Sequence, residues 1–389
     1  MKIVFFISVM GHGSGGHAHS LNHIARKIGE KHEVIIITIG PGKSSVLQSN
    51  PYFYKHIDFN GLNLLYLKNE IMNVKNNFRP DIYHCFDISS YNIIRLFISS
   101  ETKRLIVTKC GGPNPKKYPH ITNIVLFSLE DLEWFKKNNK YKNTYISFIP
   151  NRINLDSLGL ESHPIDICDD YFIFLRICRF NSVYEKSIND SFRLIEYLYS
   201  HNINNVRLYV IGVIENYELF ELLNNHELVK KGLVSLLTDR EYTSEASKML
   251  YLASAVIGTG RGLMEAASLS IPVLAINAKG NIPVLLDETN FEDAFITNFS
   301  TRNVFRTYDE DLNLGNIIRL ITDHNYYDQM SQYSKNIFED YFDIDKAEEK
   351  YNQLYHNARY GKRRILCDLL FIIKSQIGFY RNYLVRTKK

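Results

Sequence analysis

Long hydrophobic runs, paired cysteines and a strong excess of one charge are all missing from this sequence of 389 residues. No stretch reaches the roughly 18–20 consecutive apolar residues that a membrane-spanning helix needs. The longest candidate, Ile365–Leu384, is interrupted by Asp368, Lys374, Gln376 and Arg381. The sequence therefore predicts a protein that is soluble or lies on a membrane surface.

The cysteines and the charge balance exclude further classes of protein. The five cysteines, at positions 85, 110, 168, 178 and 367, form neither a C-x-x-C pair nor a metal-binding spacing, which is typical of reduced thiols in the cytoplasm. The N-terminal apolar run Ile3–Met10 has no small-residue cleavage site behind it, so we expect a cytoplasmic location. With 46 Lys and Arg against 42 Asp and Glu, the net charge of +4 gives no reason to expect a nucleic-acid ligand.

Short apolar runs alternate with amphipathic segments along the whole chain. The runs read as buried strands at Ile3–Met10, Glu33–Ile39, Asp81–Cys85, Leu105–Lys109 and Asn123–Phe127, and then at Tyr171–Ile177, Val206–Ile211, Val234–Leu237, Ala255–Ile257 and Pro272–Ile276. Helical patterns separate some of them, at His19–Ile28, Ile188–Tyr199 and Thr243–Leu252. This alternation predicts an α/β protein with parallel sheets covered by helices on both sides.

A break in the pattern divides the chain into two parts. From Pro150 to Asp170 the sequence is rich in Asn, Asp, Ser, Gly and Pro, which is typical of a linker. We therefore expect two doubly wound, Rossmann-like domains, 1–158 and 159–335. Open α/β sheets bind ligands at the carboxyl ends of their strands, so two such domains are expected to face a central cleft.

A glycine-rich loop, Gly11–His17, follows the first predicted strand and precedes a helix. Glycines let the backbone approach a ligand closely, and the free N–H groups of a helix start attract an anion such as a phosphate, here near Gly15 and Gly16. The loop has neither the G-x-G-x-x-G spacing of dinucleotide sites nor the G-K-[ST] ending of a P-loop. An ordinary tight turn between strand and helix is the alternative interpretation.

Two cations follow the first strand of the second domain. Arg179 comes directly after that strand, and Lys186 lies at the start of the next helix. Cations at this place can neutralise a diphosphate leaving group as its bond breaks. The same residues can also be ordinary surface charges.

The most specific local pattern is a second glycine-lined helix start, Gly258–Gly262, followed by Glu265. Such a helix start can bind phosphate oxygens, and a carboxylate one turn further can accept hydrogen bonds from a ribose diol. The alternative is a carboxylate that only interacts with the helix dipole.

The segment G-T-G-R-G-L-M-E-A-A-S-L-S-I-P-V-L-A, which begins at Gly258, resembles the donor-site signature of retaining GT-B glycosyltransferases of family 4. The loop after the first strand, Pro80–His84, Ile149–Ile153 and the pair Arg179 and Lys186 match in register, so the resemblance covers most of Met1–Tyr355. It implies a GT-B fold in which Arg179 and Lys186 hold the donor diphosphate. The further donor-binding residues that it implies are Gly15, Gly16, Gly260, Arg261, Gly262 and Glu265. It implies neither a metal nor a cofactor.

The sequence departs from that family at two places. The family commonly has a second glutamate at the position of Ile257, and Cys110 stands where many members have an active-site histidine. Lys109 is therefore a candidate catalytic residue. The acceptor-side candidates are His84, Gly111, Gly112 and Asn114, and for His84 a purely structural role is the equally strong alternative.

The third region, 336–389, is expected to be helical, and the resemblance implies that its helices around Asn336–Tyr355 cross back to the first domain. Beyond them, Lys362–Arg364 and an apolar helical pattern that ends in Arg386–Lys389 predict a basic amphipathic tail, which either packs on the body or contacts an anionic membrane. Asp343-Ile344-Asp345 spells the D-x-D of another glycosyltransferase fold, but we expect it to cap a helix rather than to bind a metal.

These features together predict a glycosyltransferase that uses a nucleotide diphosphate sugar and a glycan acceptor, which can be lipid-linked. We expect retention of configuration and a role in bacterial surface polysaccharide such as capsule or O-antigen, on the inner face of the cell membrane. Two alternatives stay open. One is a catalytically silent GT-B scaffold that assists another glycosyltransferase, and the other is an enzyme that modifies NAD or a sugar nucleotide.

Overall fold

The computed structural model describes residues 1–11, 13, 15–155, 171–362 and 364–387. The chain divides into two compact units. Unit 1 combines Met1–Asn154 with the C-terminal segment Ile344–Lys389, and unit 2 is Leu155–Asp343. Most of the predicted linker lies outside the described residues.

In its described part, unit 1 contains one parallel sheet of seven strands with the order β3-β2-β1-β4-β5-β6-β7. The strands are β1 (Lys2–Ser8), β2 (Glu33–Gly40), β3 (Phe53–Asp58), β4 (Ile82–Cys85), β5 (Arg104–Lys109), β6 (Asn123–Leu126) and β7 (Tyr145–Phe148). The chain moves outward from β1 to β3 and then returns to place β4 on the other side of β1. The topological switch point therefore lies between β1 and β4.

The alternating residues of β1 explain why unit 1 has two cores. Ile3, Phe5 and Ile7 belong to the core that α1 (Gly16–Gly29) and α14 (Asp345–Asn357) cover. Val4 and Phe6 point to the opposite face. The helices on that face are α3 (Leu64–Asn77), α4 (Ile88–Ile94), α5 (Leu129–Lys137) and α15 (Leu369–Thr387). The short helix α2 (Ser45–Gln48) adds Leu47 to the first core.

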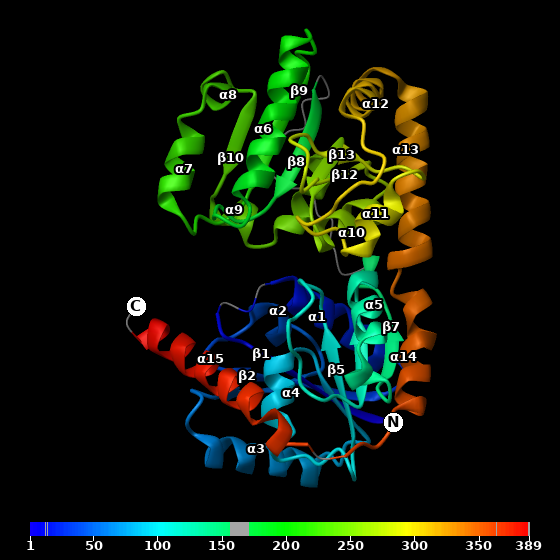
Figure 1. The fold of residues 1–389 in the computed structure, drawn as a ribbon. Helices are drawn as coiled ribbons and strands as arrows, with labels where there is room; N and C mark the ends of the chain where they lie inside the picture. The colour runs from blue at the N-terminus through cyan, green and yellow to red at the C-terminus, as the bar shows by residue number, and fades with distance from the viewer. Residues whose placement is uncertain (12, 14, 156–170, 363, 388–389) are drawn as a thin grey trace. The chain divides into compact units, whose positions relative to one another are not determined.

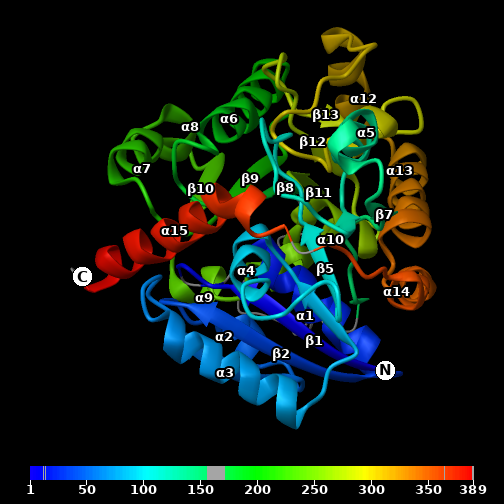
Figure 2. The same ribbon diagram turned by 60° about the horizontal axis from the view of Figure 1, so that its bottom comes forward.

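The C-terminal helix α15 is an integral part of unit 1 and lies alongside α4 in both views (Figures 1 and 2). The buried carboxylate of Asp368, which precedes α15, accepts a hydrogen bond from Arg95 Nη2 at 2.8 Å. At the other end, Arg386 Nη1 donates to the carbonyl of Pro41 at 2.5 Å. Because Arg95 follows α4 and Pro41 follows β2, α15 runs from the amino edge of the sheet to its carboxyl edge. No helix in the described residues is long and apolar enough to cross a membrane.

Unit 2 has a six-stranded sheet in its described part, with the order β10-β9-β8-β11-β12-β13. The strands are β8 (Phe172–Ile177), β9 (Val206–Ile211), β10 (Val234–Leu237), β11 (Ala255–Gly258), β12 (Val273–Ala275) and the antiparallel β13 (Val284–Leu285). The helices are α6 (Glu185–Ser200), α7 (Tyr217–Asn224), α8 (Glu227–Lys230), α9 (Arg240–Thr243), α10 (Arg261–Ser268), α11 (Phe291–Ile296), α12 (Glu310–Thr322) and α13 (His324–Ile337). Here the switch point lies between β8 and β11.

The predicted α/β class is confirmed, with differences in single elements. The predictions missed β3, β7 and β13, which lie at sheet edges or are very short. Such strands alternate less clearly between apolar and polar residues because only part of each is buried. Most of the helix expected at Thr243–Leu252 is a 3-10 helix at Ala246–Leu252.

The expectation that Asp343-Ile344-Asp345 caps a helix is wrong in detail. Ile344 occupies the N-cap of α14, and no side chain caps that helix. Asp345 lies in the first turn, where its carboxylate pairs with Lys27 of α1 at 2.8 Å. Lys27 is largely buried but Asp345 is exposed, so this partly exposed ion pair fastens α14 to α1 only weakly.

Because α15 supplies core to unit 1, truncating its buried aromatic residue should destabilise that unit. Phe379 is fully buried and packs edge-on against Phe59 with ring centroids 4.9 Å apart. We expect Phe379→Ala to lower the free energy of unfolding by about 3–5 kcal/mol. Tyr383→Ala, at a position 37% exposed on the same helix, is the control and should cost far less. Urea unfolding measures both, and equal stability of the two variants would show that α15 is not part of the core.

Candidate functional site

In unit 2, the glycine-lined segment and Arg179 lie at the switch point of the sheet. Strands β8 and β11 are parallel neighbours, with Ala255 opposite Phe174. Arg179 follows β8 and Gly258 ends β11, so both lie at the carboxyl edge where open α/β sheets bind ligands. The structure thus brings these two predicted elements to adjacent strand ends.

Gly260 makes the tight turn from β11 into α10. Its φ of +55° lies in the region that favours glycine, and its N–H donates to the carbonyl of Phe299 at 2.7 Å. One residue into the helix, a Cβ added at Gly262 would meet no atom within 4 Å. The start of α10 therefore combines a positive dipole end with open space, which suits an anionic group.

Glu265 lies in α10 and pairs with Arg261 in the same helix. Arg261 Nε donates to Glu265 Oε1 at 2.7 Å, and both side chains are largely buried. Burial raises the pKa of Glu265, and the positive charge of Arg261 opposes that rise. Oε2 accepts no hydrogen bond from any described residue, so this carboxylate retains one oxygen for a ligand.

Arg179 is half-exposed and loosely held. Its Nη1 lies 3.3 Å from Glu215 Oε1, and the other oxygen of Glu215 accepts a hydrogen bond from Asn181 at 2.7 Å. An exposed ion pair of this kind is worth no more than about 1 kcal/mol. Arg179 can therefore exchange Glu215 for a phosphate at little cost.

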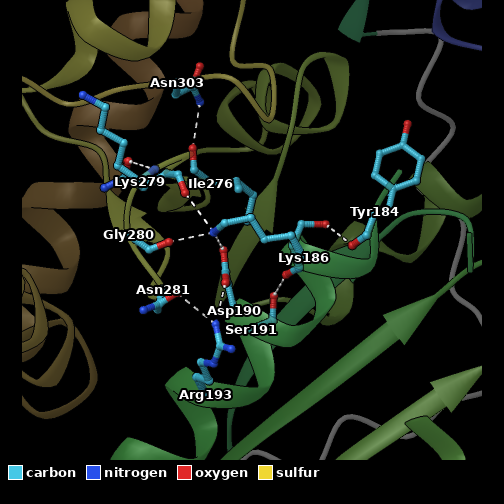
Figure 3. Close-up of polar contacts among 12 residues, drawn as sticks. Tyr184, Lys186, Asp190, Ser191, Arg193, Ile276, Lys279, Gly280, Asn281 and Asn303 are labelled. Carbon is cyan, nitrogen blue, oxygen red and sulfur yellow. Dashed lines mark hydrogen bonds and ion pairs between the residues drawn. The ribbon is translucent and has the colours of Figure 1, made fainter. Parts of the chain in front are cut away.

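Lys186 is engaged much more firmly (Figure 3). Its ammonium donates to Asp190 Oδ2 at 2.5 Å and to the carbonyls of Asn277 and Gly280 at 3.0 and 2.7 Å. Asp190 is fully buried and also accepts from Arg193 at 3.3 Å. Lys186 thus ties α6 to the loop after β12, a role that the sequence did not indicate.

Position 257, where the family pattern commonly has a glutamate, is a core position in this structure. Ile257 is fully buried in β11, where it joins the core of unit 2. Only Thr259 and Gly260 separate β11 from α10. The side chain at position 257 therefore packs into the core of unit 2 instead of facing solvent at the start of α10.

In unit 1, the described part of the first glycine-rich loop also lies at a switch point. Gly15 is the N-cap of α1, which begins at Gly16. Across the switch point, Asp87 caps α4 and accepts hydrogen bonds from the backbone N–H and hydroxyl of Ser8 at 2.6 and 2.8 Å. Asp87 joins the ends of β1 and β4, and no local sequence pattern marks it.

Lys109 is buried and makes the loop after β5 rigid. Its ammonium lies 2.9 Å from Asp131 and donates to the carbonyls of Gly111 and Gly112 at 2.7 and 3.2 Å. The two glycines have φ values of +102° and +82°. The structure therefore places Lys109 beneath the predicted acceptor loop, where it organises the loop, and Asn114 remains exposed.

His84 and Cys110 do not form a binding surface. His84 is fully buried, with Nε2 2.7 Å from Thr108 Oγ1 and Nδ1 3.2 Å from the hydroxyl of Tyr355. The expectation that His84 lines the acceptor side is wrong, because its ring lies in the core under α14. Burial raises the pKa of Cys110, whose thiol donates to the carbonyl of Phe86 at 3.4 Å.

The buried pair of Lys109 and Asp131 allows a test of the role of Lys109. Burial raises the pKa of Asp131. We expect Lys109→Met to lower the free energy of unfolding by about 3–5 kcal/mol, because it leaves a buried carboxylate without its cation. Adding Asp131→Asn should restore part of the loss, whereas Lys137→Met, in an exposed pair, should have little effect. Urea unfolding tests this, and a Lys109→Met protein of normal stability that lacks activity would instead assign the lysine to the reaction.

The buried His84 predicts a pH dependence of stability. Burial lowers its pKa to about 3, whereas a histidine in the unfolded chain titrates near about 6.5. Between these values the unfolded chain binds more protons, so stability decreases as the pH falls from about 6.5, by up to about 1.4 kcal/mol per pH unit. We expect the free energy of unfolding of His84→Gln to depend less on pH in this range than that of the wild type. The exposed control His324→Gln should keep the pH dependence of the wild type. Identical slopes from urea unfolding at several pH values in all three proteins would contradict the prediction.

Comparison with known proteins identifies the architecture. No protein-family model and no curated protein matches the sequence. Among solved structures, HepE from Anabaena in complex with UDP is 13% identical, with a TM-score of 0.64 over 91% of this chain and 99% of that one. A glycosyltransferase from Rickettsia africae ESF-5 is 16% identical, with a TM-score of 0.65 over 92% and 98%. Sucrose-phosphate synthase from Thermosynechococcus elongatus is 14% identical, with a TM-score of 0.61 over 92% of this chain and 98% of that one. The chain has the GT-B fold.

Proposed function

We propose that this chain is a glycosyltransferase that moves a sugar from a nucleotide diphosphate sugar to a hydroxyl of a glycan. The observation that carries the proposal is the open, glycine-capped start of α10 at the switch point of unit 2, with Glu265 in the same helix. The likeness in fold to a UDP-bound HepE and to a glycosyltransferase supports it.

The donor would be held by backbone groups and two side chains of unit 2. The N–H groups at the start of α10 bind phosphate oxygens, and Arg179 exchanges Glu215 for the diphosphate. The free Oε2 of Glu265 accepts hydrogen bonds from the ribose hydroxyls. In other transferases a metal ion often stabilises the departing diphosphate, whereas here Arg179 and the helix dipole supply that positive charge, so we propose a metal-independent reaction.

Lys186 has a positioning role in this proposal. Its ammonium already has three oxygen partners, so it orders the loop that contains Asn277 and Gly280. Exchange of one carbonyl frees an N–H for a phosphate oxygen without leaving Asp190 uncompensated. Lys186 can therefore contact the donor and keep the buried carboxylate paired.

Unit 1 would supply the acceptor side. The exposed loop of Gly111, Gly112 and Asn114 binds the acceptor, and Lys109 keeps that loop in place from below. For a retaining reaction, the acceptor oxygen bonds to the anomeric carbon on the face from which the phosphate departs. The departing phosphate takes the acceptor's proton, so the burial of His84 and the thiol at Cys110 remove no required base.

The solvent-facing side of α15 supports contact with an anionic membrane. Leu366, Leu370, Ile373, Ile377 and Leu384 form one stripe at helical spacing, and their exposed fractions range from 37% to 87%. The sequence from Leu369 to Lys389 contains no Asp or Glu, so every charged side chain that accompanies the stripe is basic. We propose that this surface places the enzyme on the inner face of the cell membrane, where a lipid-linked glycan for surface polysaccharide is accessible.

The donor site predicts a nucleotide-dependent gain in stability that requires Glu265. Screening UDP, GDP, CMP, dTDP and ADP by thermal shift should identify one nucleotide that raises Tm, since a ligand at a roughly hundredfold excess over its Kd adds about 2.7 kcal/mol. Glu265→Gln keeps a partner for Arg261 but loses the charge, and should weaken that nucleotide about tenfold or more. Glu218→Gln, an exposed carboxylate in the first turn of α7, is the control. Unchanged binding in Glu265→Gln would show that the donor lies elsewhere.

Turnover separates this function from the alternatives. Nucleotide release from a donor sugar, above the background without protein, marks an enzyme. Nucleotide binding without release under any acceptor condition would favour the silent scaffold, for which the firmly engaged Lys186 is the structural argument. A thermal shift with NAD(P)H alone would favour a modifying enzyme instead.

A further inference from the structure

A cavity in unit 1 lies away from the glycine-rich loops, at the amino edge of the sheet. Its volume is about 660 Å³, within the range of small-molecule sites. Leu105 at the start of β5, Thr122 before β6 and Thr144 before β7 line it. The segment that connects α14 to α15 runs along the same edge (Figure 1), and its described lining residues are Arg359–Lys362, Arg364 and Ile365. We call this the basic cavity.

The lining of the basic cavity is strongly cationic. The lysine and arginine side chains that line it are Arg95, Lys140, Lys142, Arg359, Lys362 and Arg364. Glu101 is the one acidic residue among the described lining. Arg95 is neutralised by Asp368, but Lys142, Lys362 and Arg364 form no ion pair with any described residue. Several positive charges therefore share one cavity without compensation.

Two cations of the cavity, Arg95 and Lys140, lie in unfavourable surroundings. Arg95 is more than nine-tenths buried, and its Nε has no hydrogen-bond partner in the described structure. Burial lowers the pKa of Lys140, and the neighbouring charge of Arg95 lowers it further, against an opposing effect of Asp368. An unpaired buried donor and a charge beside a like charge are both costly, and a bound anion would relieve both.

We propose that the basic cavity binds a ligand with phosphate groups that carry at least two negative charges. Arginine binds phosphate oxygens in pairs and lysine adds point charges, so the lining matches this chemistry. Both a free diphosphate and the headgroup of an anionic phospholipid carry such negatively charged phosphate groups. Leu366 follows the lining residue Ile365 directly, and Leu366 and Leu370 are 87% and 73% exposed. This site is independent of the donor site in unit 2.

The test measures binding of two probes to the full-length chain. Pyrophosphate represents the free anion and is followed by calorimetry. Phosphatidylcholine vesicles with and without phosphatidylglycerol represent the lipid and are followed by co-sedimentation. The cavity variant is Lys142→Gln with Arg364→Gln, and the matched control is Lys230→Gln with Lys231→Gln, two exposed lysines of unit 2. Both variants lose two charges, so any difference between them is due to the cavity rather than to net charge.

We expect the cavity variant to bind its probe about tenfold more weakly and the control to bind as the wild type does. Binding of pyrophosphate alone assigns the site to a free phosphate ligand, and cavity-dependent binding of phosphatidylglycerol vesicles assigns it to a headgroup. Absence of binding to both probes, or an equal loss in the control, overturns the proposal. In the vesicle assay, Leu366→Ser with Leu370→Ser, against the control Leu222→Ser with Leu312→Ser, tests the apolar stripe of α15 separately.

Discussion

A parallel sheet that is covered by helices on both faces can present chemistry only at its edges, and this constraint governs both units. The strands are almost wholly apolar because each face packs into a core, as the alternating residues of β1 show. Polar and glycine residues therefore gather where strands end. The carboxyl edge is the richer one, because helices begin there and their free N–H groups attract anions. At both switch points the chain turns away in opposite directions, which leaves room for a ligand.

Buried carboxylates determine what the lysines at these edges do. Asp190 and Asp131 are fully buried, and a buried charge without a partner is far more costly than an exposed one. Lys186 pairs with Asp190, and Lys109 pairs with Asp131. Each lysine also donates its other N–H groups to the carbonyls of a nearby loop. Loops of glycine would otherwise be the most mobile parts of a site. The two lysines thus order the surroundings of the ligand, while the exposed Arg179 is better placed to move toward it.

The sequence predicts the scaffold better than the partners of individual side chains. Hydrophobic periodicity and glycine placement reveal the sheets and the start of α10, because both are local properties. The pairing of Lys109 with Asp131 depends on how α5 packs beside β5, and no local pattern reports such packing. His84 shows the same limit, since its burial depends on Tyr355 of α14, far away in sequence. Partners that come from distant segments become visible only in the folded chain.

The amino edge of the sheet in unit 1 differs from the carboxyl edge in the charge that its backbone attracts. Helices end at this edge, and their free carbonyl groups attract cations rather than anions. The side chains there reverse this preference, because the returning segment after α14 adds arginine and lysine to those already present. Uncompensated like charges destabilise a folded domain, and the exposed apolar stripe of α15 adds a second unfavourable surface. The like charges come from several segments of unit 1, whereas the exposed apolar residues belong to the C-terminal segment. We propose that a bound anionic ligand offsets the repulsion between the like charges, while α15 keeps its packing within unit 1.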